Sequence, residues 1–401
     1  MSKSVVIVDG VRTPYGRIGG SLRDFAAVDL AAIAIRGLVD KTKILEKGKI
    51  DSVFAGTALG DSKASNPARY AALKAGLPYE VSASYIEMQC GSAIDCINHA
   101  AWQIASNSAD VIIAGGMESY SQMPFRFPSS TPPYQVMPPL PIIPSLSPAK
   151  EDDIDMLHVS ELLAKQWGVS RQECDTFAFN SQQRAGHAMA AGYFDDELIP
   201  VSVPTGRKTP PIVFDKDEHP RPDTTLEALS GLKAVLGPDC VTTAGNASGR
   251  NDGAAFVLLM NEEKAAELGY TPYARWLAGA DVGVDPKVMG IGAAYATLMA
   301  IERSGLSVSD IDVFECNEAF ASQNLAVVKE IEKLTGHTID METWNPNGGA
   351  IAFGHPNGSS GARVCIFTMK ELVRKKGKYG VFSSCCGGGL GVATLIENLR
   401  R

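Results

Sequence analysis

The sequence predicts an α/β protein made of two similar halves, with a loop domain inserted into the first half. Short apolar runs alternate with helical patterns of about ten to fifteen residues, which is typical of a mostly parallel sheet. Prolines cluster in the middle of the chain, and each half carries a Gly-rich turn followed by a strand that runs into glycines. At about 150 residues per domain, the 401 residues suffice for two or three domains.

The first half begins with alternating strand and helix patterns. Residues 5–8 are four consecutive apolar residues, as in a buried strand, and residues 28–39 have the spacing of an amphipathic helix. The same patterns predict strands at 52–58 and 111–114 and a helix at 92–106. We therefore assign residues 1–118 to the first half.

The middle of the chain is rich in proline. Nine of the 23 prolines fall between residues 124 and 148, and six more lie between 200 and 222. Because proline removes backbone donors and disfavours regular helix and sheet, we expect irregular surface segments there. Helical patterns at 156–192 and 225–236 lie beside them. We assign 119–248 to an inserted loop domain that covers the active site.

The α/β pattern resumes after the insertion. A strand at 254–260 belongs to the first half, which we extend over 249–270, and residues 271–401 form the second half. The predicted elements of the second half are a helix at 293–304, a strand at 311–315, a helix at 361–375, and strands at 380–384 and 391–396.

Composition excludes several classes of protein. The net charge of −8 argues against a nucleic-acid-binding surface. Four apolar residues at 5–8 are too few for a signal-peptide core, and no run approaches the ~18 apolar residues of a membrane helix. The eight cysteines show neither CxxC nor zinc-ligand spacing. We expect a cytoplasmic protein with free thiols and no metal.

Cys90 is a candidate nucleophile. It lies in MQCGSAIDCI, after a strand-like stretch at 84–88 and at the expected start of the helix 92–106. Unpaired N–H groups and the positive end of a helix dipole would stabilise a thiolate there and lower the thiol pKa. The alternative is a small buried residue at a tight turn.

His355 is a candidate base, in the run GGAIAFGHPNGSSGAR, which is too rich in glycine for a regular element before residue 361. A helix start disfavours the cationic imidazole, so a neutral base or hydrogen-bond donor is expected. The glycines would allow the close approach of a ligand to the backbone. A purely structural histidine is the alternative.

Other polar groups have two interpretations each. Asn317 and Glu318 follow an apolar strand within ECNEAF and are either a helix-capping pair or site residues. Glu118, in GGMES, is equally open. The run TTAGNASGRNDGAA at 242–255 is either an irregular loop or a set of hydrogen-bonding groups for an amide-rich ligand.

Two adjacent cysteines, Cys385 and Cys386, precede three glycines at the end of an apolar strand. Adjacent cysteines rarely bond to each other, so we expect no disulfide between them. The GGGLG run is similar to a dinucleotide-binding turn, but residues 391–396 have a strand pattern where that motif requires a helix. We therefore discount NAD binding.

The chain resembles the thiolase family in six motifs that occur along its whole length. They are CGSA at 90–93, GGMES at 115–119, TAGNASGRNDGA at 243–254, NEAF at 317–320, NPNGGAIAFGHPNGSSGAR at 345–363 and CCGGGLG at 385–391. VRTPYGR at 11–17 and SRQECDTFAFNSQQRA at 170–185 extend the resemblance. It implies a five-layered αβαβα core of two similar halves with an inserted loop domain.

The resemblance also implies an activity and its catalytic residues. Thiolases interconvert two acyl-CoA molecules with a 3-ketoacyl-CoA and free CoA, which are substrates, and need no metal or redox cofactor. By position, Cys90 is expected to accept the acyl group and His355 to activate it. Cys385, not the cysteine after it, is expected to move the α-proton. His355 and a water held by Asn317 would stabilise the enolate, and the backbone N–H groups of Cys90 and Gly387 the tetrahedral intermediate.

Substrate contacts and partners follow from the same resemblance. Ser248 matches a residue that contacts pantetheine, Arg221 one near the adenine, and Met289 and Phe320 match walls of the acyl pocket. Acyl-CoA and CoA are the expected partners. The loop at 124–148 is unlike the one that links dimers into tetramers in short-chain biosynthetic members, so a homodimer is expected before a homotetramer.

Four residues depart from the family pattern. Ala93 stands where glycine is usual, and Ala293 stands where proline is expected after glycine. Leu157 and His158 replace a glycine and an apolar residue in a segment that shapes the acyl and pantetheine pocket. The acyl-chain preference therefore stays open.

Several functions are compatible with parts of the pattern. Condensation of two acetyl-CoA to acetoacetyl-CoA plus CoA is the simplest, whereas EHPRPDTT at 218–225 is also common in degradative 3-ketoacyl-CoA thiolases that act on longer or unusual acyl chains. A decarboxylating ketosynthase does not use a second cysteine like Cys385. A non-catalytic acyl-CoA or lipid carrier typically lacks a site residue, and none is missing here.

Overall fold

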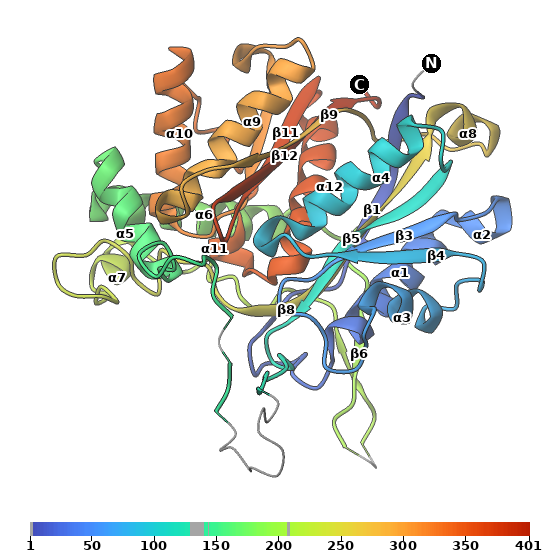
Figure 1. Ribbon diagram of the computed structural model, residues 1–401, viewed down its shortest axis with the longest axis horizontal. Helices are drawn as coiled ribbons and strands as arrows, with labels where there is room; N and C mark the ends of the chain where they lie inside the picture. Colours follow the sequence, from blue (N-terminus) through green and yellow to red (C-terminus); the bar gives the residue numbers. More distant parts are fainter. Residues whose placement is uncertain (1–2, 129–139, 143, 207–208) are drawn as a thin grey trace.

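The computed structural model describes residues 3–128, 140–142, 144–206 and 209–401 (Figure 1). Its main sheet follows the order β10-β11-β12-β9-β1-β8-β5-β3-β4, and the short β2 pairs with β8. These strands are β1 (Val5–Arg12), β2 (Gly16–Arg17), β3 (Ser52–Gly56), β4 (Ser82–Ile86), β5 (Val111–Ser119), β8 (Asn251–Asn261), β9 (Ala274–Gly283), β10 (Val313–Cys316), β11 (Tyr379–Cys386) and β12 (Leu390–Asn398). The two halves of the sheet join where β1 pairs with β9.

The helices form three layers around the two halves of the sheet. They are α1 (Ala27–Thr42), α2 (Ile44–Lys47), α3 (Pro67–Lys74), α4 (Ser92–Ala105), α5 (Met156–Trp167), α6 (Arg171–Ala190), α7 (Leu226–Ser230), α8 (Glu262–Glu267), α9 (Gly292–Arg303), α10 (Ala321–Thr335), α11 (Ala350–Phe353) and α12 (Asn357–Lys375). One core packs α1 and α3 on the first half, and another packs α9, α10, α5 and α6 on the second. The third core places α4 and α12 between the halves. The expected αβαβα layering is confirmed.

The middle layer depends on small residues. A Cβ on Gly361 of α12 would lie 2.6 Å from the backbone nitrogen of Ile94 in α4. The two helices can therefore approach each other to backbone contact only because residue 361 is glycine. The N-terminus of α4 follows the turn after β4, and the N-terminus of α12 packs against the end of β5.

The prediction of a mostly parallel sheet is wrong. Strand β3 is parallel to β4 and β5, and β10 is parallel to β11, but the pairs β1–β8, β1–β9, β5–β8, β11–β12 and β9–β12 are antiparallel. The antiparallel pairing results from the way in which these strands are connected. A tight hairpin joins β11 to β12, and β8 follows the long insertion, so neither has the crossover helix that a parallel pair requires.

Several boundaries also differ from the predictions. The helix expected at 225–236 is limited to α7, and the helix expected at 361–375 begins at Asn357. The proline-rich run at 200–222 contains a small hairpin of β6 (Val201–Val203) and β7 (Ile212–Phe214), because its prolines lie outside the paired residues. Much of the run at 124–148 lies outside the described residues.

Strand β9 and helices α3 and α10 did not emerge from the apolar patterns. Strand β9 has partly exposed positions, and α10 has a polar outer face, which weakened the periodic signal. Among the helices of the described segments, none is long and apolar enough to cross a membrane.

Candidate active site

Cys90 lies in a tight turn between β4 and α4. The turn is a short 3-10 segment, Gln89–Gly91, and Gln89 has a left-handed φ of 48°. The Ser92 hydroxyl accepts the N–H of Met88 at 2.9 Å and donates to the Gln89 carbonyl at 2.7 Å. A non-glycine residue in this backbone region is strained, and such strain is common where a side chain must be held in place.

The thiol of Cys90 is protonated in this environment. Burial raises the pKa of Cys90 to about 12, and the nearby Glu118 adds to the rise. The prediction of a lowered thiol pKa is therefore wrong, because the cost of desolvating a thiolate outweighs the helix N-terminus. Cys90 consequently requires a base before it can act as a nucleophile.

His355 is fixed by its backbone and by one ring nitrogen. Its N–H donates to the Gly249 carbonyl and to Asn251 Oδ1, both at 3.1 Å. The Nδ1 atom lies 2.6 Å from the Ser360 hydroxyl, which donates to the Pro356 carbonyl. Because that hydroxyl donates its proton to the carbonyl, it can only accept a hydrogen bond from Nδ1. We therefore assign the ring proton to Nδ1, which leaves Nε2 as an acceptor.

The imidazole is neutral. Burial lowers the pKa of His355 to about 3, and the positive charge of Arg363 lowers it further. This agrees with the neutral base expected from the sequence, although burial and not the helix start is the main cause. Nε2 is therefore able to accept a proton.

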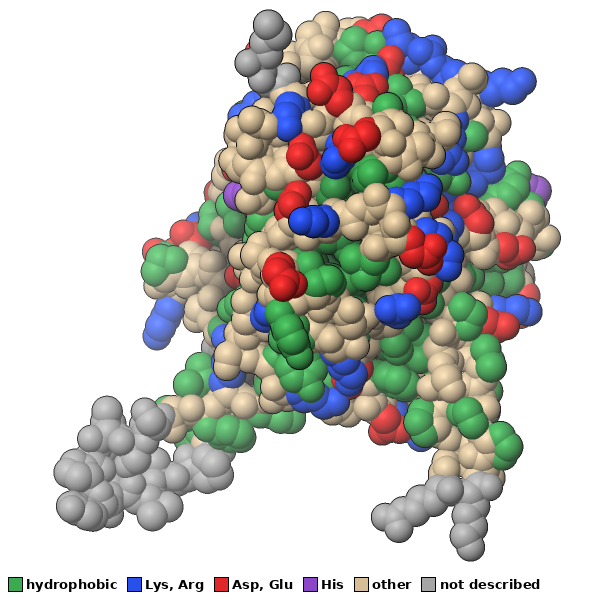
Figure 2. All heavy atoms as spheres, turned by 90° about the vertical axis from the view of Figure 1, so that its right-hand side faces the viewer, with side chains coloured by type: hydrophobic (Ala, Val, Ile, Leu, Met, Phe, Trp, Pro, Cys, Tyr) green, Lys and Arg blue, Asp and Glu red, His purple; other side chains and the backbone are tan. Residues whose placement is uncertain are grey.

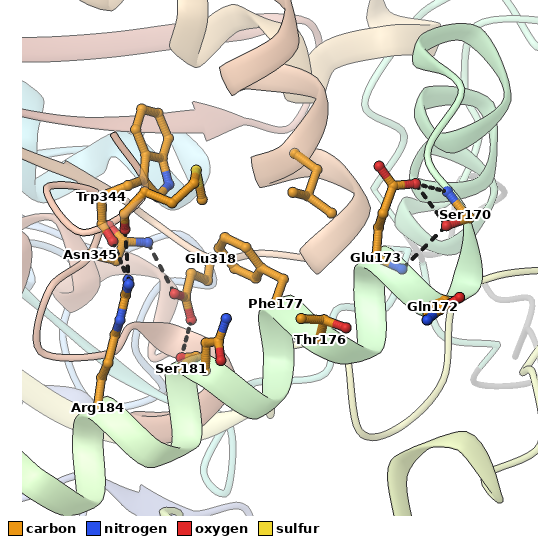
Figure 3. Close-up of a pocket in the computed structure, with 13 residues that line it drawn as sticks. Ser170, Gln172, Glu173, Thr176, Phe177, Ser181, Arg184, Glu318, Trp344 and Asn345 are labelled. Atoms are coloured by element: carbon orange, nitrogen blue, oxygen red, sulfur yellow. Dashed lines mark hydrogen bonds between the residues drawn. The ribbon is translucent and has the colours of Figure 1, made fainter. Parts of the chain in front are cut away.

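Asn317 and Glu318 point in different directions from the end of β10. The Asn317 amide nitrogen lies 3.4 Å from His355 Nε2, and its buried Oδ1 has no hydrogen-bond partner among the described residues. Glu318 lies on the other side, where it accepts the Ser181 hydroxyl at 2.7 Å (Figure 3). The residue at the N-cap position of α10 is Phe320, so Asn317 and Glu318 do not cap the helix that follows them in the sequence.

The pocket on the Glu318 side has a volume of about 330 Å³. Figure 3 shows α6 along one wall and Trp344 and Asn345 across from it. The Asn345 amide donates to Glu318 at 3.0 Å, and the Arg184 guanidinium donates to the Trp344 carbonyl at 2.7 Å. This pocket is therefore lined by Glu318, the residue that follows Asn317, and His355 is not among the described residues that line it.

Cys385 lies on β11, directly before the hairpin to β12. Burial raises the pKa of Cys385 well above its usual value, and the charge of a Cys90 thiolate would raise it further. The hairpin requires glycine, because Gly388 and Gly389 have φ values of 86° and 88°. A Cβ on Gly387 would lie 3.3 Å from the side chain of Gln89. The hairpin thus contacts the turn that carries Cys90.

Cys386 faces the opposite side of β11, as neighbouring residues on a strand do. Its sulfur lies against Gly91, where an added Cβ would be 2.5 Å from Sγ, and it belongs to the central core with α4 and α12. Cys385 belongs to the outer core of the second half. All eight cysteines are free, as expected.

The predicted substrate residues lie in three places. Ser248 lies beside the Asn317 turn, since its N–H donates to the Ala319 carbonyl at 3.0 Å and Ala247 bridges Phe320. Met289 is buried in the same core as Cys385. Arg221 is exposed in the inserted region.

The four residues that depart from the family pattern lie in three different helices. Ala93 and Ala293 are fully buried in α4 and α9. Leu157 is half-buried, and His158 is exposed, with Nδ1 2.6 Å from the Asp155 carboxylate that caps α5.

Glu118 is a buried carboxylate at the end of β5. It accepts four groups, the Thr57 hydroxyl and the N–H groups of Ala58, Leu59 and Gly358, at 2.9 to 3.3 Å. Burial raises the pKa of Glu118 to about 7, against the lowering effect of these donors.

The sequence reasoning did not single out Gln89, Asn251 or Ser360. Two of them had a local signal: Asn251 lies in the polar run 242–255, and Ser360 lies five residues after His355 on the first turn of α12. Within the described segments, no group of three or more His, Cys, Asp or Glu is placed to hold a metal.

Known proteins are similar to this chain over its whole length. The family model "Thiolase, N-terminal domain" matches residues 5–263, and "Thiolase, C-terminal domain" matches 270–398. A β-ketoadipyl-CoA thiolase of Escherichia coli is 41% identical over 415 residues, covering 99% of this chain and 100% of that protein. An acetyl-CoA acetyltransferase of Allochromatium vinosum is 40% identical over 403 residues, covering 100% of both chains. The crystal structure of human mitochondrial 3-ketoacyl-CoA thiolase in complex with CoA has a TM-score of 0.89 at 38% identity, covering 99% of this chain and 98% of that one.

Proposed function

The chain belongs to the thiolase family and is an acyltransferase, and on this premise we propose that it condenses two acetyl-CoA molecules to acetoacetyl-CoA plus CoA and catalyses the reverse thiolysis. The proposal is carried by three buried groups: the thiols of Cys90 and Cys385, which lie close enough for charge on Cys90 to raise the pKa of Cys385, and the neutral imidazole of His355. A condensation of two thioesters needs both a nucleophile and a separate group that moves the α-proton.

In the first half-reaction, Cys90 attacks the thioester carbonyl while His355 Nε2 takes its proton. Both groups are neutral beforehand, so charge develops only during the attack. The imidazolium then passes this proton to the leaving CoA thiolate, so that the products are CoA, an acyl-cysteine and a neutral imidazole. The N–H groups of Cys90 and Gly387 support the proposal as donors to the oxyanion, because the two turns that carry them are in contact.

In the second half-reaction, the Cys385 thiol first passes its proton to His355 Nε2, and the resulting thiolate removes the α-proton of the incoming acetyl-CoA. The enolate attacks the acyl-cysteine, and Cys90 leaves as a thiolate that takes the proton held by His355. The unpartnered Oδ1 of Asn317 is free to hold a water, which would donate to the enolate oxygen together with His355.

CoA binding is proposed for the region between the insertion and the Asn317 turn. The solved relative that binds CoA has the same overall fold, and Ser248 lies against that turn here. We assign Ser248 to the pantetheine, exposed Arg221 to the adenine end, and Met289 with Phe320 to the acyl pocket. No redox cofactor or metal takes part in the proposed steps.

A second substrate is favoured by the relatives named β-ketoadipyl-CoA thiolase. Thiolysis rates for acetoacetyl-CoA, longer 3-ketoacyl-CoAs and 3-oxoadipyl-CoA would separate the two proposals. We expect acetoacetyl-CoA to be the best substrate. If it is the poorest, the acetyltransferase proposal is wrong and the degradative one replaces it.

We also propose a homodimer that forms through the edge of the sheet at β4. An unpaired edge strand is a template for pairing with a second copy. Figure 2 shows hydrophobic side chains on this face among charged ones. Exposed apolar residues on and around β4 are Tyr70, Leu73, Tyr79 and Tyr85. Sedimentation equilibrium of wild type and of Tyr85→Lys tests this, since the variant should shift towards monomer.

The proposed compartment is the cytoplasm. Eight free cysteines, two of them assigned to catalysis, require a reducing environment. Incubation with oxidised glutathione should abolish activity, and dithiothreitol should restore it.

A further inference from the structure

His355 lies between two helix starts that cannot cap themselves. The short helix α11 ends just before it, and α12 begins just after it. The N-cap residues of these helices are Gly349 and Pro356, and neither has a side chain that accepts a hydrogen bond. The first N–H groups of a helix lack partners within the helix, and in a buried segment they must find them elsewhere.

Glu318 supplies the acceptor for the first of these helices. Its Oε2 accepts the N–H of Ile351 at 3.1 Å and the Ser181 hydroxyl at 2.7 Å. A Cβ on Gly349 would lie 2.3 Å from the Glu318 carboxyl carbon. Glycine at the N-cap of α11 therefore has no side chain to cap the helix, and its small size leaves space for the carboxylate of another element.

Glu118 does the same for the second helix. Its Oε2 accepts the N–H of Gly358, in the first turn of α12, at 2.9 Å. A Cβ on Gly358 would lie 2.5 Å from the Met117 carbonyl, so this helix start packs directly on β5. Both oxygens of Glu118 accept donors, which is the pattern of an ionised carboxylate.

Between these two points, the backbone has one further anchor. Gly354 has a φ of 91°, and an added Cβ would lie 2.1 Å from the Asn251 side chain. The same side chain accepts the His355 N–H. The eight-residue path from Ile351 to Gly358 is thus held by two carboxylates at its ends and by an amide in its middle.

We infer that Glu318 and Glu118 are positioning residues that cap α11 and α12 from the ends of β10 and β5 and thereby hold His355 Nε2 where it can take the proton of Cys90. This inference rests on the proposed function of His355. It assigns a role to two carboxylates that do not themselves touch the reacting atoms. Their placement on two different strands means that both halves of the fold fix the same imidazole.

The test is the single-turnover acetylation of Cys90 by acetyl-CoA, followed by mass spectrometry, in Glu318→Gln, Glu118→Gln and the double variant. Glutamine keeps the side-chain size but presents an NH₂ group where the carboxylate accepted a donor. Because small displacements of a catalytic group are costly, we expect acetylation to slow about 10- to 100-fold in the double variant. The steady-state kcat should fall while KM changes little.

Asp51→Asn is the matched control. Asp51 Oδ2 accepts the N–H groups of Asp110 and Val111, at 2.8 and 2.9 Å, at the opposite end of β5 from Glu118. This substitution removes the same kind of contact from the same strand, and we expect wild-type acetylation with a similar loss of thermal stability. If the glutamate variants lose stability like the control and still acetylate Cys90 at the wild-type rate, the inference is wrong.

Chemical rescue gives a second readout. Glu318→Ala removes a carboxylate that lines the pocket of about 330 Å³ in Figure 3, and acetate is small enough to enter. We expect acetate, but not chloride at equal ionic strength, to restore part of the acetylation rate. The inference is overturned if the acetylation rate of Glu318→Ala is the same in acetate as in chloride and the glutamine variants acetylate Cys90 at the wild-type rate.

His355→Ala separates this inference from the proposed function. If that variant acetylates Cys90 as fast as wild type, the proposed role of His355 fails. If it is slow but the glutamate variants are not, only the positioning role fails.

Discussion

Cys90 and Cys385 are both buried thiols of the same site, but the local structures that present them differ. Cys90 lies in a strained turn with a left-handed residue before it, whereas Cys385 lies on a regular strand, and the glycine hairpin follows it. Burial raises the pKa of both thiols. A turn can place a side chain between two elements. On a strand, successive side chains point to opposite faces, so Cys386 faces away from Cys385.

The comparison indicates how two thiols of the same chemistry can serve as nucleophile and as proton carrier. His355 Nε2 and the Asn317 amide nitrogen lie 3.4 Å apart in the second half of the chain. Cys90 belongs to the first half, in the turn that the hairpin after Cys385 contacts. Cys385 shares its outer core with apolar residues and Cys316. We therefore assign nucleophile and proton carrier by surroundings, since the thiol pKa values alone do not distinguish the two.

Removing the nucleophile should have the largest effect. In Cys90→Ala no acyl-enzyme can form, so we expect turnover in both directions to fall by about four orders of magnitude or more. Stopped assays of condensation and thiolysis, with intact-mass measurement after incubation with acetyl-CoA, check this. An acetyl adduct of wild-type abundance on the variant would refute the assignment.

Removing the proton carrier should separate the half-reactions. Cys385→Ala is expected to abolish condensation, because the α-proton has no acceptor, and to leave acetylation of Cys90 detectable by mass spectrometry. Cys386→Ala is the matched control from the neighbouring position on the strand, and should retain condensation. Full turnover by Cys385→Ala would remove the two-cysteine mechanism.

The hairpin after Cys385 should be sensitive to a single methyl group. A Cβ on Gly389 would lie 2.4 Å from the Val284 carbonyl, whereas the atom nearest to one on Gly388 is 3.2 Å away. Both residues have positive φ, which costs an L-residue about 1–2 kcal/mol. Urea unfolding should show a larger loss for Gly389→Ala than for Gly388→Ala. Equal losses would mean that strain alone, and not the contact, requires glycine at residue 389.

The smallest effect is expected from pH. Acetylation of Cys90 uses the neutral thiol and the neutral imidazole. The neutral imidazole is lost only as pH falls through the lowered pKa of His355, about 3, and the neutral thiol only as pH rises through the raised pKa of Cys90, about 12. The rate should therefore be flat between about pH 6 and 9. A rapid-quench profile with a midpoint near the ordinary histidine pKa of about 6.5 would contradict this.

Much of the fold could be predicted because it depends on local pattern. The helix α4 and the strands β3 and β8 are apolar, periodic or bounded by turn residues, and the sequence located them closely. The antiparallel pairing of β8 with β1 and β5, and of β12 with β11 and β9, could not be predicted in this way. It depends on which strand lies beside which after a long insertion or a hairpin, and residues far apart in sequence decide that.

The candidate site shows the same limit. Residue type and motif singled out Cys90, His355 and Cys385, because few residues can act as nucleophile or base. They could not indicate that Asn317 and Glu318, adjacent in sequence, contact different elements, or that Glu118 accepts a hydrogen bond from the start of α12. The sign of the Cys90 pKa shift was also beyond local pattern, because it depends on burial by distant segments.

By itself, the sequence determined the reactive groups of this protein, the glycines around them and the α/β class, since these follow from side-chain chemistry and from local periodicity. The αβαβα layering was implied by the resemblance to the thiolase family. Tertiary structure alone decided that burial raises the pKa of both thiols, and that the carboxylates of Glu118 and Glu318 accept hydrogen bonds from the segment around His355. The physical reason is that charge state and position depend on desolvation and on hydrogen bonds between parts of the chain separated by up to 240 residues.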